Sequence, residues 1–320
     1  MGEFPRRRHY ALAMRTLVIG AGGVGGYLAA RLVQAGSDVT IAARGEHGRA
    51  LQDGGIAITT ERGVEHIALP RVVASADELH ERFDLVLLAV KFSGLAAACD
   101  ALPNLIDPYG VVLPLLNGLT SEDVVAQYVG AQRTIAGVAY MSAGIVSPGA
   151  IYANGNTRVA IAPYRAGQDA DLARVQALFT AAAVPVQRHD DAPTMLWQKM
   201  VWNAPFNGIC ALARQSAGVC AKQLEPLVAR AMREVVAVAR AEGVFIPDQL
   251  IDVMLRVTRE EFALTEPSML QDVRSGRPTE VEVLQGEVVA RAERLGVDVP
   301  VLTTLAGLIR ALDSNLASSP

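Results

Sequence analysis

Cysteine is scarce in this chain, with three residues in 320. Cys99, Cys210 and Cys220 are odd in number and form no CxxC pair, so the sequence predicts neither a disulfide framework nor a structural zinc site. A reducing, cytoplasmic location is expected instead. Apolar runs such as 85–90 and 111–116 are far shorter than the roughly 18 residues that mark a membrane span, so we expect no transmembrane helix.

Strong positive charge and the common hydrolase or metal motifs are also lacking. The net charge of −4 provides no basic surface for nucleic acid. The five histidines never fall at metal-ligand spacing, and neither a GxSxG elbow nor a P-loop occurs, so we expect no metal. Residues 1–13 are basic but lack the apolar stretch of a signal peptide, and we interpret them as an extension before a fold that begins at Met14.

Residues 15–44 contain the strongest positive signal, a β-α-β pattern around a glycine-rich turn. An apolar strand leads into Gly20-x-Gly22-x-x-Gly25, and a helical apolar period and a second strand at 38–43 follow. This order is typical of a dinucleotide-binding unit, in which backbone N–H groups at the helix start bind the pyrophosphate. The alternative is a glycine-rich turn that only packs. The expected cofactor contacts in this turn are Gly20, Ala21, Gly22, Gly23, Val24 and Gly25.

The end of the second strand favours NADP(H) over NAD(H). NAD-binding units of this type carry an acidic residue there, which binds the ribose 2′-hydroxyl. This chain has Arg44 and no acid at that point. A guanidinium can bind a 2′-phosphate through two hydrogen bonds, whereas a carboxylate would repel it. An exposed loop arginine without a ligand is the alternative.

The remaining pattern predicts an α/β fold, with an N-terminal Rossmann-type doubly wound sheet followed by an all-α second domain. Apolar runs at 84–90 and 111–116 are typical of parallel strands buried on both faces. Toward the C-terminus, segments with a 3.6-residue period replace strand-like runs. We therefore expect an NADP-binding domain at 14–190 and a helical substrate domain at 191–320. Further strands are expected at 56–60, 66–69, 134–142, 150–152, 158–162 and 184–188, and helices at 95–105, 121–128, 172–182, 194–213, 224–242, 249–265, 279–295 and 301–312.

Two polar residues follow the buried strands, at the edge where doubly wound sheets bind ligands. Lys91 follows the run at 84–90 and could contact the cofactor. Asn117 follows the run at 111–116 and could place its amide near the nicotinamide ribose or the substrate. Each could instead be a loop residue that only caps an element.

A polar stripe lies in the first helix expected for the second domain. Lys199, Asn203 and Asn207 are four residues apart, so they project from one face of that helix. Asparagine is a poor helix former, and two of them beside a lysine in an apolar segment favour a polar file that faces a cleft. Pro205 removes the hydrogen bond to the carbonyl of Val201 and tends to bend the helix. The alternative is a solvated stripe, which more typically contains Glu, Arg and Lys.

A third group of candidates lies between 266 and 281. Thr279 is expected to cap a helix, which places Glu280 in the first turn, where the helix dipole stabilises a carboxylate. Ser268 could cap a helix or bind an anionic substrate. A hydride-transfer enzyme needs no metal if a cation stabilises the oxygen that gains charge.

Together these residues resemble the ketopantoate reductase (2-dehydropantoate 2-reductase) family over nearly the whole chain, 14–312. The resemblance rests on GAGGVGGY at 20–27, Val90-Lys91, Asn117-Gly118, the stripe of Lys199, Asn203 and Asn207, and Ser268-Met269 with Asp272, Thr279 and Glu280. It implies NADPH-dependent reduction of a 2-oxo acid to a 2-hydroxy acid. Ketopantoate is the favoured substrate, as in pantothenate and coenzyme A synthesis.

The resemblance also implies a role for each candidate residue. Lys199 would donate a proton to the C2 oxygen of the substrate, and Glu280 would help to orient that lysine. Arg44 would bind the 2′-phosphate. The implied substrate-binding residues are Asn117, Asn203, Asn207 and Ser268. The implied cofactor residues outside the glycine-rich turn are Arg44, Lys91, Asn117 and Glu280.

The chain departs from the family pattern at three places, which are 92–94, the surroundings of Pro205, and 216–218. At the last of these a further substrate asparagine is expected and is absent. The departures do not affect the residues implied for cofactor binding and general chemistry. They do leave a second class of substrate as an alternative, namely another branched or aromatic 2-oxo acid. A non-catalytic NADPH-binding sensor is the alternative from a different class of protein. Helical second domains of this kind often dimerise, so a homodimer is one possible assembly.

Overall fold

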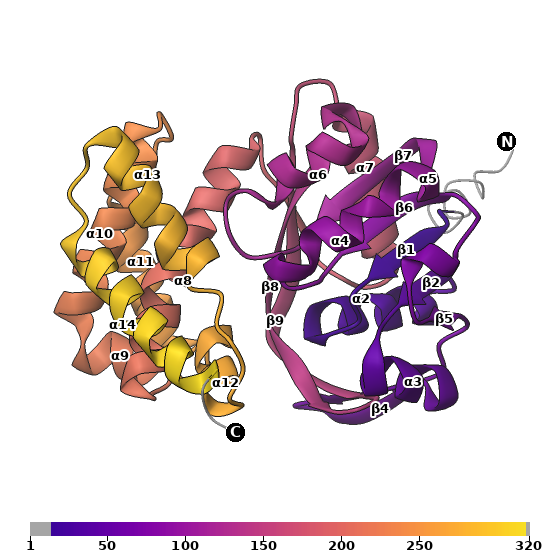
Figure 1. Cartoon of the computed structure of the whole chain (residues 1–320), viewed down its shortest axis with the longest axis horizontal. Helices are drawn as coiled ribbons and strands as arrows, with labels where there is room; N and C mark the ends of the chain where they lie inside the picture. Colours follow the sequence, from indigo (N-terminus) through magenta and orange to yellow (C-terminus); the bar gives the residue numbers. More distant parts are fainter. Residues whose placement is uncertain (1–13, 318–320) are drawn as a thin grey trace, which may run out of the picture. The chain divides into compact units, whose positions relative to one another are not determined.

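The computed structural model describes residues 14–317, which form two compact units (Figure 1). The first unit includes the chain up to Leu116 and from Thr120 to Ala192. The second unit includes Asn117–Leu119 and the chain from Pro193 onward. The extension expected at 1–13 lies outside the described residues. Within them, no helix is both long enough and apolar enough to cross a membrane.

A parallel sheet of five strands organises the first unit. Its strands are β1 (Thr16–Ile19), β2 (Val39–Ala42), β5 (Val72–Val73), β6 (Phe83–Leu88) and β7 (Ile106–Pro114). Their order is β5-β2-β1-β6-β7, and every neighbouring pair is parallel. The direction of strand succession reverses between β1 and β6, which is where open α/β sheets bind their ligands. The doubly wound sheet expected from the sequence is therefore confirmed.

Helices pack on both faces of this sheet because successive strand residues point to opposite sides. The helices are α2 (Gly23–Gln34), α3 (Gly45–Gly54), α4 (Leu95–Asp100), α5 (Leu102–Leu105), α6 (Ser121–Val129) and α7 (Asp169–Ala181). Val18 belongs to the core that includes α2 and α7, whereas Leu17 belongs to the core that includes α4, α5 and α6. The sequence predicts one helix at 95–105, but two form, because Pro103 in the first turn of α5 has no N–H to continue the ladder.

A second sheet packs in the same core as α2. Its strands are β3 (Ile56–Thr60), β4 (Gly63–Ile67), β8 (Ile135–Ser147), β9 (Ala150–Pro163) and β10 (Val186–Arg188). The order is β10-β9-β3-β4, and β8 pairs with β9. The sequence predicts separate strands at 150–152 and 158–162, but β9 is one strand, because antiparallel pairing with β8 extends along it. The first strand of this hairpin also continues beyond the predicted 134–142.

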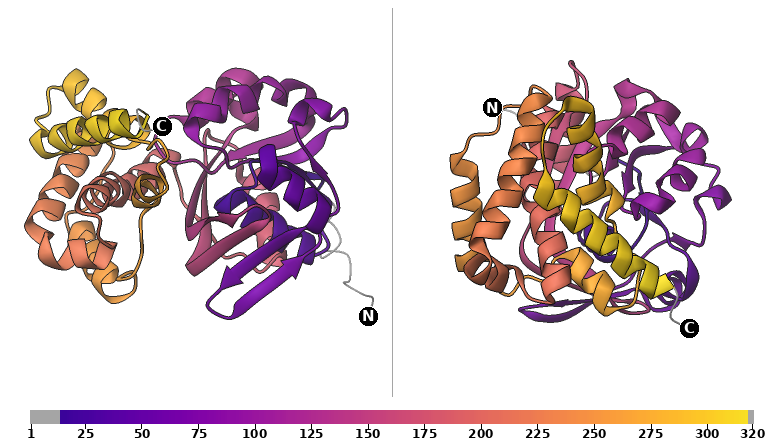
Figure 2. Two further views of the ribbon diagram at one scale, coloured as in Figure 1. Left: turned by 60° about the horizontal axis from the view of Figure 1, so that its bottom comes forward. Right: turned by 60° about the vertical axis from the view of Figure 1, so that its left-hand side comes forward.

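The second unit is helical throughout the part of the chain that is described (Figure 2). Its helices are α8 (Ala192–Ala213), α9 (Ala217–Gln223), α10 (Glu225–Ala241), α11 (Gln249–Glu260), α12 (Ser268–Arg274), α13 (Glu287–Leu295) and α14 (Pro300–Ala317). The sequence pattern does not predict α9 and α12, because seven residues are too few to display a helical period. The helix expected at 279–295 starts with a π-helical turn, Glu282–Gly286, and the helix expected at 249–265 ends at Glu260.

Candidate functional site

The glycine-rich turn lies where β1 ends and α2 begins, beside the end of β6. Gly20 has a φ of +94°, and a Cβ atom there would lie 2.7 Å from the carbonyl oxygen of Ala89. A Cβ at Gly25 would lie 1.9 Å from the carbonyl oxygen of Gly20, so only glycine lets the helix start this close to the strand. A Cβ at Gly22 would meet nothing within 4 Å. Packing therefore explains Gly20 and Gly25 but leaves open space beside Gly22.

The other residues of the turn contribute backbone rather than side chains. Ala21 is buried, and Val24 packs against the core of the sheet. Gly23 starts α2, and a Cβ there would lie 2.4 Å from the backbone of Ala143 in β8. The first N–H groups of α2 have no partners within the helix, and they begin beside the open space at Gly22. This arrangement fits the pyrophosphate of a dinucleotide cofactor.

Two exposed basic residues, Arg44 and Lys91, follow the strands on either side of β1. Arg44 directly precedes α3. A Cβ at Gly48 would lie 1.9 Å from the carbonyl oxygen of Ala43, so α3 packs closely on the turn that carries Arg44. Lys91 follows β6, and its carbonyl oxygen accepts a hydrogen bond of 2.9 Å from the N–H of Gly94. Both residues thus lie at the edge formed by the carboxyl ends of the parallel strands, and their cofactor contacts stay a prediction.

His47, which the sequence pattern does not single out, links the glycine-rich turn to two other segments. It lies in the first turn of α3, and its Nε2 is 2.9 Å from the carbonyl oxygen of Ala21. The N–H of Gly149, in the turn between β8 and β9, donates to its Nδ1 at 3.1 Å. Because Nδ1 accepts this bond, the neutral ring carries its proton on Nε2 and donates to Ala21. The one sequence signal for this role is the position of His47 three residues after Arg44.

In the second unit, hydrogen bonds connect three candidate residues from distant parts of the sequence. The side-chain amide of Asn203 donates to Oδ1 of Asn117 at 3.2 Å. The amide of Asn117 in turn donates to Oε2 of Glu280 at 3.2 Å. Asn203 is buried, and the other two are half-buried, so these bonds are stronger than they would be in water. Asn117 therefore bridges α8 and the carboxylate of Glu280.

Asn207 extends this chain to the start of α12. Its Nδ2 donates to the carbonyl oxygen of Asn203 at 3.0 Å. Its Oδ1 accepts two hydrogen bonds, from the hydroxyl of Ser268 at 3.1 Å and from the N–H of Met269 at 3.0 Å. Asn207 is 2% exposed, whereas Ser268 is exposed. The hydroxyl oxygen of Ser268 can therefore still accept a hydrogen bond from a ligand.

Lys199 lies one helical turn before Asn203 on the same face of α8, and it is half-buried. The turn of helix between them is anchored by Trp202. The indole ring stacks on Phe206, with ring centroids 4.8 Å apart, and its Nε1 donates to the hydroxyl of Thr258 in α11 at 3.0 Å. These contacts hold the part of α8 that carries Lys199 and Asn203.

The predicted helix cap at Thr279 is wrong. The hydroxyl of Thr279 donates to Oδ2 of Asp313 in α14 at 2.7 Å, and its N–H points to the same carboxylate. It therefore binds another helix instead of capping its own. Glu280 lies two residues before the first residue of the π-helical turn, Glu282, and its carbonyl oxygen accepts a hydrogen bond of 3.2 Å from the N–H of Leu284.

Gln285 is a second residue that the sequence reasoning misses. It is fully buried in the π-helical turn, a kind of turn that is frequent at functional sites. Its Nε2 donates to the carbonyl oxygen of Ala204 at 2.5 Å, and a Cβ at Gly208 would lie 2.9 Å from that nitrogen. Its Oε1 has no hydrogen-bond partner among the described residues. Gln285 thus fixes the segment after Glu280 against the middle of α8.

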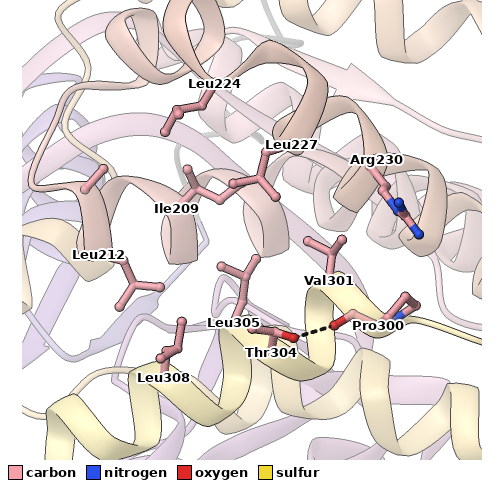
Figure 3. Close-up of a pocket in the computed structure, with 11 residues that line it drawn as sticks. Ile209, Leu212, Leu224, Leu227, Arg230, Pro300, Val301, Thr304, Leu305 and Leu308 are labelled. Atoms are coloured by element: carbon pink, nitrogen blue, oxygen red, sulfur yellow. Dashed lines mark hydrogen bonds between the residues drawn. The ribbon is translucent and has the colours of Figure 1, made fainter.

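An apolar groove of about 500 Å³ opens elsewhere on the second unit, between α8, α10 and α14 (Figure 3). Its walls include Ile209, Leu212, Leu227 and Leu308, and Arg230 lies at its side. Small polar ligands are oriented by a few convergent polar groups, which these walls do not provide. None of the candidate residues lines the groove, so it is not the site predicted for a 2-oxo acid.

Glu122, at the start of α6, is a buried carboxyl group outside both candidate regions. It is 2% exposed, and burial raises its pKa to about 7. The hydroxyl of Ser121 donates to its Oε2 at 2.9 Å, and the N–H of Gly137 donates to its Oε1 at 3.4 Å. In the part of the chain that the structure describes, no cluster of His, Cys, Asp and Glu could hold a metal ion.

Family models match both parts of the chain. Residues 16–166 match the model described as ketopantoate reductase PanE/ApbA, and residues 191–313 match the model for the C-terminal part of the same proteins. Among curated relatives, the 2-dehydropantoate 2-reductase of Halobacterium salinarum is 31% identical over 300 residues. That match covers 93% of this chain and 98% of the relative.

Solved structures show the same likeness. A ketopantoate reductase from Ralstonia eutropha JMP134 is 30% identical, with a TM-score of 0.83, and the match covers 94% of this chain and 99% of that one. D-mandelate dehydrogenase with NADH and anilino(oxo)acetate gives a TM-score of 0.88 at 23% identity, with the same coverage. A dimeric ketopantoate reductase from Staphylococcus aureus gives 0.79 at 22% identity, again covering 94% and 99%. For the last two structures, at 23% and 22% identity, the similarity shows a shared fold and nothing more.

Proposed function

The chain belongs to the ketopantoate reductase PanE/ApbA family of oxidoreductases, and from this premise we propose that it uses NADPH to reduce a 2-oxo acid to a 2-hydroxy acid. Ketopantoate is the favoured substrate, because relatives that match almost the whole chain carry the name 2-dehydropantoate 2-reductase. The observation that carries the proposal is the hydrogen-bonded chain from Glu280 through Asn117 to Asn203, one helical turn from Lys199.

Lys199 acts as the general acid in this proposal. Its ammonium group donates a hydrogen bond to the C2 carbonyl oxygen of the substrate and transfers its proton as that oxygen gains charge. The nicotinamide cofactor, when bound, supplies a hydride to C2. The product therefore has a new C–H bond at C2 and a new O–H bond on its oxygen. Glu280, held by the amide of Asn117, orients Lys199 in this proposal.

The asparagines and Ser268 hold the substrate. The exposed hydroxyl of Ser268 and the amide of Asn203 bind its carboxylate and hydroxyl groups. Asn207 supports both, because it is bonded to the backbone of Asn203 and to the hydroxyl of Ser268. Asn117 contacts substrate and cofactor, and its bond to Glu280 fixes the direction in which its amide points.

The cofactor is held by the glycine-rich turn, Lys91 and Arg44. Arg44 supplies the preference for NADPH, because its exposed guanidinium can bind the 2′-phosphate at the end of β2. Arg44→Ala is expected to raise KM for NADPH by about 10–100-fold while KM for NADH changes little. Arg62→Ala, a change of another exposed arginine in the same unit, serves as the control. Equal effects on both cofactors would contradict the assignment of Arg44.

The activity is tested by following NADPH consumption with ketopantoate and with a panel of branched and aromatic 2-oxo acids. Ketopantoate is expected to give the highest kcat/KM. Lys199→Ala is expected to lower kcat by about 10²–10⁴-fold. Lys222→Ala, which removes an exposed lysine from α9, is expected to leave the rate unchanged. No turnover with any 2-oxo acid would refute the proposed reaction.

Another branched or aromatic 2-oxo acid is the second candidate substrate. It is supported by the fold shared with a D-mandelate dehydrogenase whose structure contains anilino(oxo)acetate. A higher kcat/KM for such an acid would replace ketopantoate without changing the proposed chemistry. A sensor that only binds NADPH would show cofactor binding, no turnover, and a function in cells that survives Lys199→Ala.

We also propose that the chain acts as a homodimer in the cytoplasm. The dimer is supported by the Staphylococcus aureus ketopantoate reductase, which is described as dimeric and shares the fold. The location is supported by the three cysteines, all of which are free. Light scattering on the purified protein should give twice the chain mass of 33.9 kDa. A mass equal to one chain would contradict the dimer.

A further inference from the structure

We propose that His47 is a positioning residue for the nicotinamide cofactor. In its neutral form the ring holds the peptide between Ala21 and Gly22 so that the N–H of Gly22 faces the pyrophosphate. The inference rests on the proposed function, because it takes the glycine-rich turn as the cofactor site.

The geometry of one peptide group supports this role. A trans peptide directs its carbonyl oxygen and the following N–H to opposite sides. The hydrogen bond of 2.9 Å from Nε2 of His47 fixes the carbonyl oxygen of Ala21, so it also fixes the direction of the N–H of Gly22. A rotated peptide would turn the carbonyl oxygen toward the phosphate and repel it. A Cβ at Gly22 would meet nothing within 4 Å, so a ligand can approach the turn from that side.

The ring of His47 is itself held from its other edge. The N–H of Gly149 donates to Nδ1 at 3.1 Å, and the carbonyl oxygen of Gly149 accepts a hydrogen bond of 2.9 Å from the N–H of Ala57 in β3. A Cβ at Gly149 would lie 3.2 Å from the Cβ of Ala50, so this turn also packs on α3. A ring with protons on both nitrogens would place an N–H against the N–H of Gly149. Both contacts therefore require the tautomer with its proton on Nε2.

The position of His47 in α3 also connects the glycine-rich turn to Arg44, the residue proposed to bind the 2′-phosphate. Arg44 and His47 are three residues apart at the start of this helix. The bond between His47 and Ala21 therefore fixes the residue proposed for the 2′-phosphate relative to the turn proposed for the pyrophosphate.

Two variants of His47 separate the two hydrogen bonds. The amide nitrogen of glutamine can replace Nε2, so His47→Gln keeps a donor for Ala21 and loses the acceptor for Gly149. The amide oxygen of asparagine can replace Nδ1, so His47→Asn keeps the acceptor for Gly149 and loses the donor for Ala21. Each variant loses one hydrogen bond, so the two should have similar unfolding temperatures without cofactor. A purely structural role would give them similar cofactor affinities as well.

The measurement is the dissociation constant of NADPH, obtained by fluorescence titration of the full chain without substrate. His47→Asn is expected to raise the constant about tenfold, and His47→Gln by less than about threefold. His80→Asn, at an exposed position of the same unit, is expected to change nothing. Equal effects of the two His47 variants, or none, would overturn the inference while leaving the proposed function standing. A wild-type chain that binds neither NADPH nor NADH would refute both.

The tautomer gives a second test that depends on no variant. Nitrogen-15 NMR of the histidine rings in the wild-type protein should show the His47 proton on Nε2, with and without NADPH. A proton on Nδ1 in the free protein would contradict the hydrogen bonds that carry the inference.

Discussion

Changing Glu122 to glutamine should remove a pH-dependent loss of stability from the first unit. The carboxyl group is 2% exposed, and burial disfavours its charged form, which raises its pKa from the ordinary 4.5 to about 7. Hydrogen bonds from the hydroxyl of Ser121 and the N–H of Gly137 favour the charged form but do not cancel the effect of burial. The folded protein therefore binds this proton more tightly than the unfolded chain does.

The sign and size of the effect follow from that difference. The contribution to stability is complete below about pH 4.5 and is lost as the pH rises through about 7. The difference between 4.5 and about 7 is about 2.5 pKa units, which corresponds to roughly 3 kcal/mol at high pH. A glutamine has no proton to lose. Its oxygen can accept the bond from Gly137, and its amide nitrogen can donate to the hydroxyl of Ser121.

Urea unfolding, followed by circular dichroism at about pH 5 and about pH 8, measures this contribution. Between these values the free energy of unfolding of the wild type should fall by roughly 2–3 kcal/mol more than that of Glu122→Gln. Glu61→Gln makes the same change at an exposed position of the first unit, between β3 and β4, and its pH dependence should match that of the wild type. Parallel curves for the wild type and Glu122→Gln would refute the reasoning.

Other substitutions test the geometry of the two candidate regions. Gly22→Ala should raise the dissociation constant of NADPH about tenfold at an unchanged melting temperature, because its Cβ would meet only a bound ligand. Gly23→Ala should instead lower the free energy of unfolding by about 1–3 kcal/mol, measured in urea, because its Cβ would overlap the backbone of β8. Asn207→Ala should raise KM for the 2-oxo acid, because Ser268 loses its partner. Gln285→Leu should lower kcat and leave the dissociation constant of NADPH unchanged, as steady-state kinetics and titration would show.

The parallel sheet could be predicted from the sequence because its signals are local. An apolar run such as 85–88, or the spacing from Gly20 to Gly25, lies within a few residues of chain. The length of β9 could not be predicted, because it depends on pairing with β8 across the hairpin. The π-helical turn at Glu282–Gly286 could not be predicted either, because one extra residue in a helix changes the spacing of apolar residues too little to be recognised.

Part of the candidate site could likewise be predicted from the sequence, and part of it could not. The stripe from Lys199 to Asn207 follows from the helical period alone. The bridge through Asn117 does not, because its partners Asn203 and Glu280 are 86 and 163 residues away in the sequence. The role proposed for His47 could not be predicted for a related reason, since it depends on the positions of two backbone groups from other segments. Sequence patterns indicate which residues are polar within apolar elements, and packing decides which of them meet.

The assignment of Asn117–Leu119 to the second unit has a consequence for protein engineering. These three residues follow β7, a strand of the first unit, but Asn117 bonds to Asn203 and Glu280, and a Cβ at Gly118 would lie 3.2 Å from the carbonyl oxygen of Val283. A gene fragment that starts at Pro193 would encode the helices of the second unit and still omit Asn117–Leu119. A chimaera that takes its helices from a relative therefore keeps the connection between Asn203 and Glu280 only if the residue at position 117 can make both hydrogen bonds.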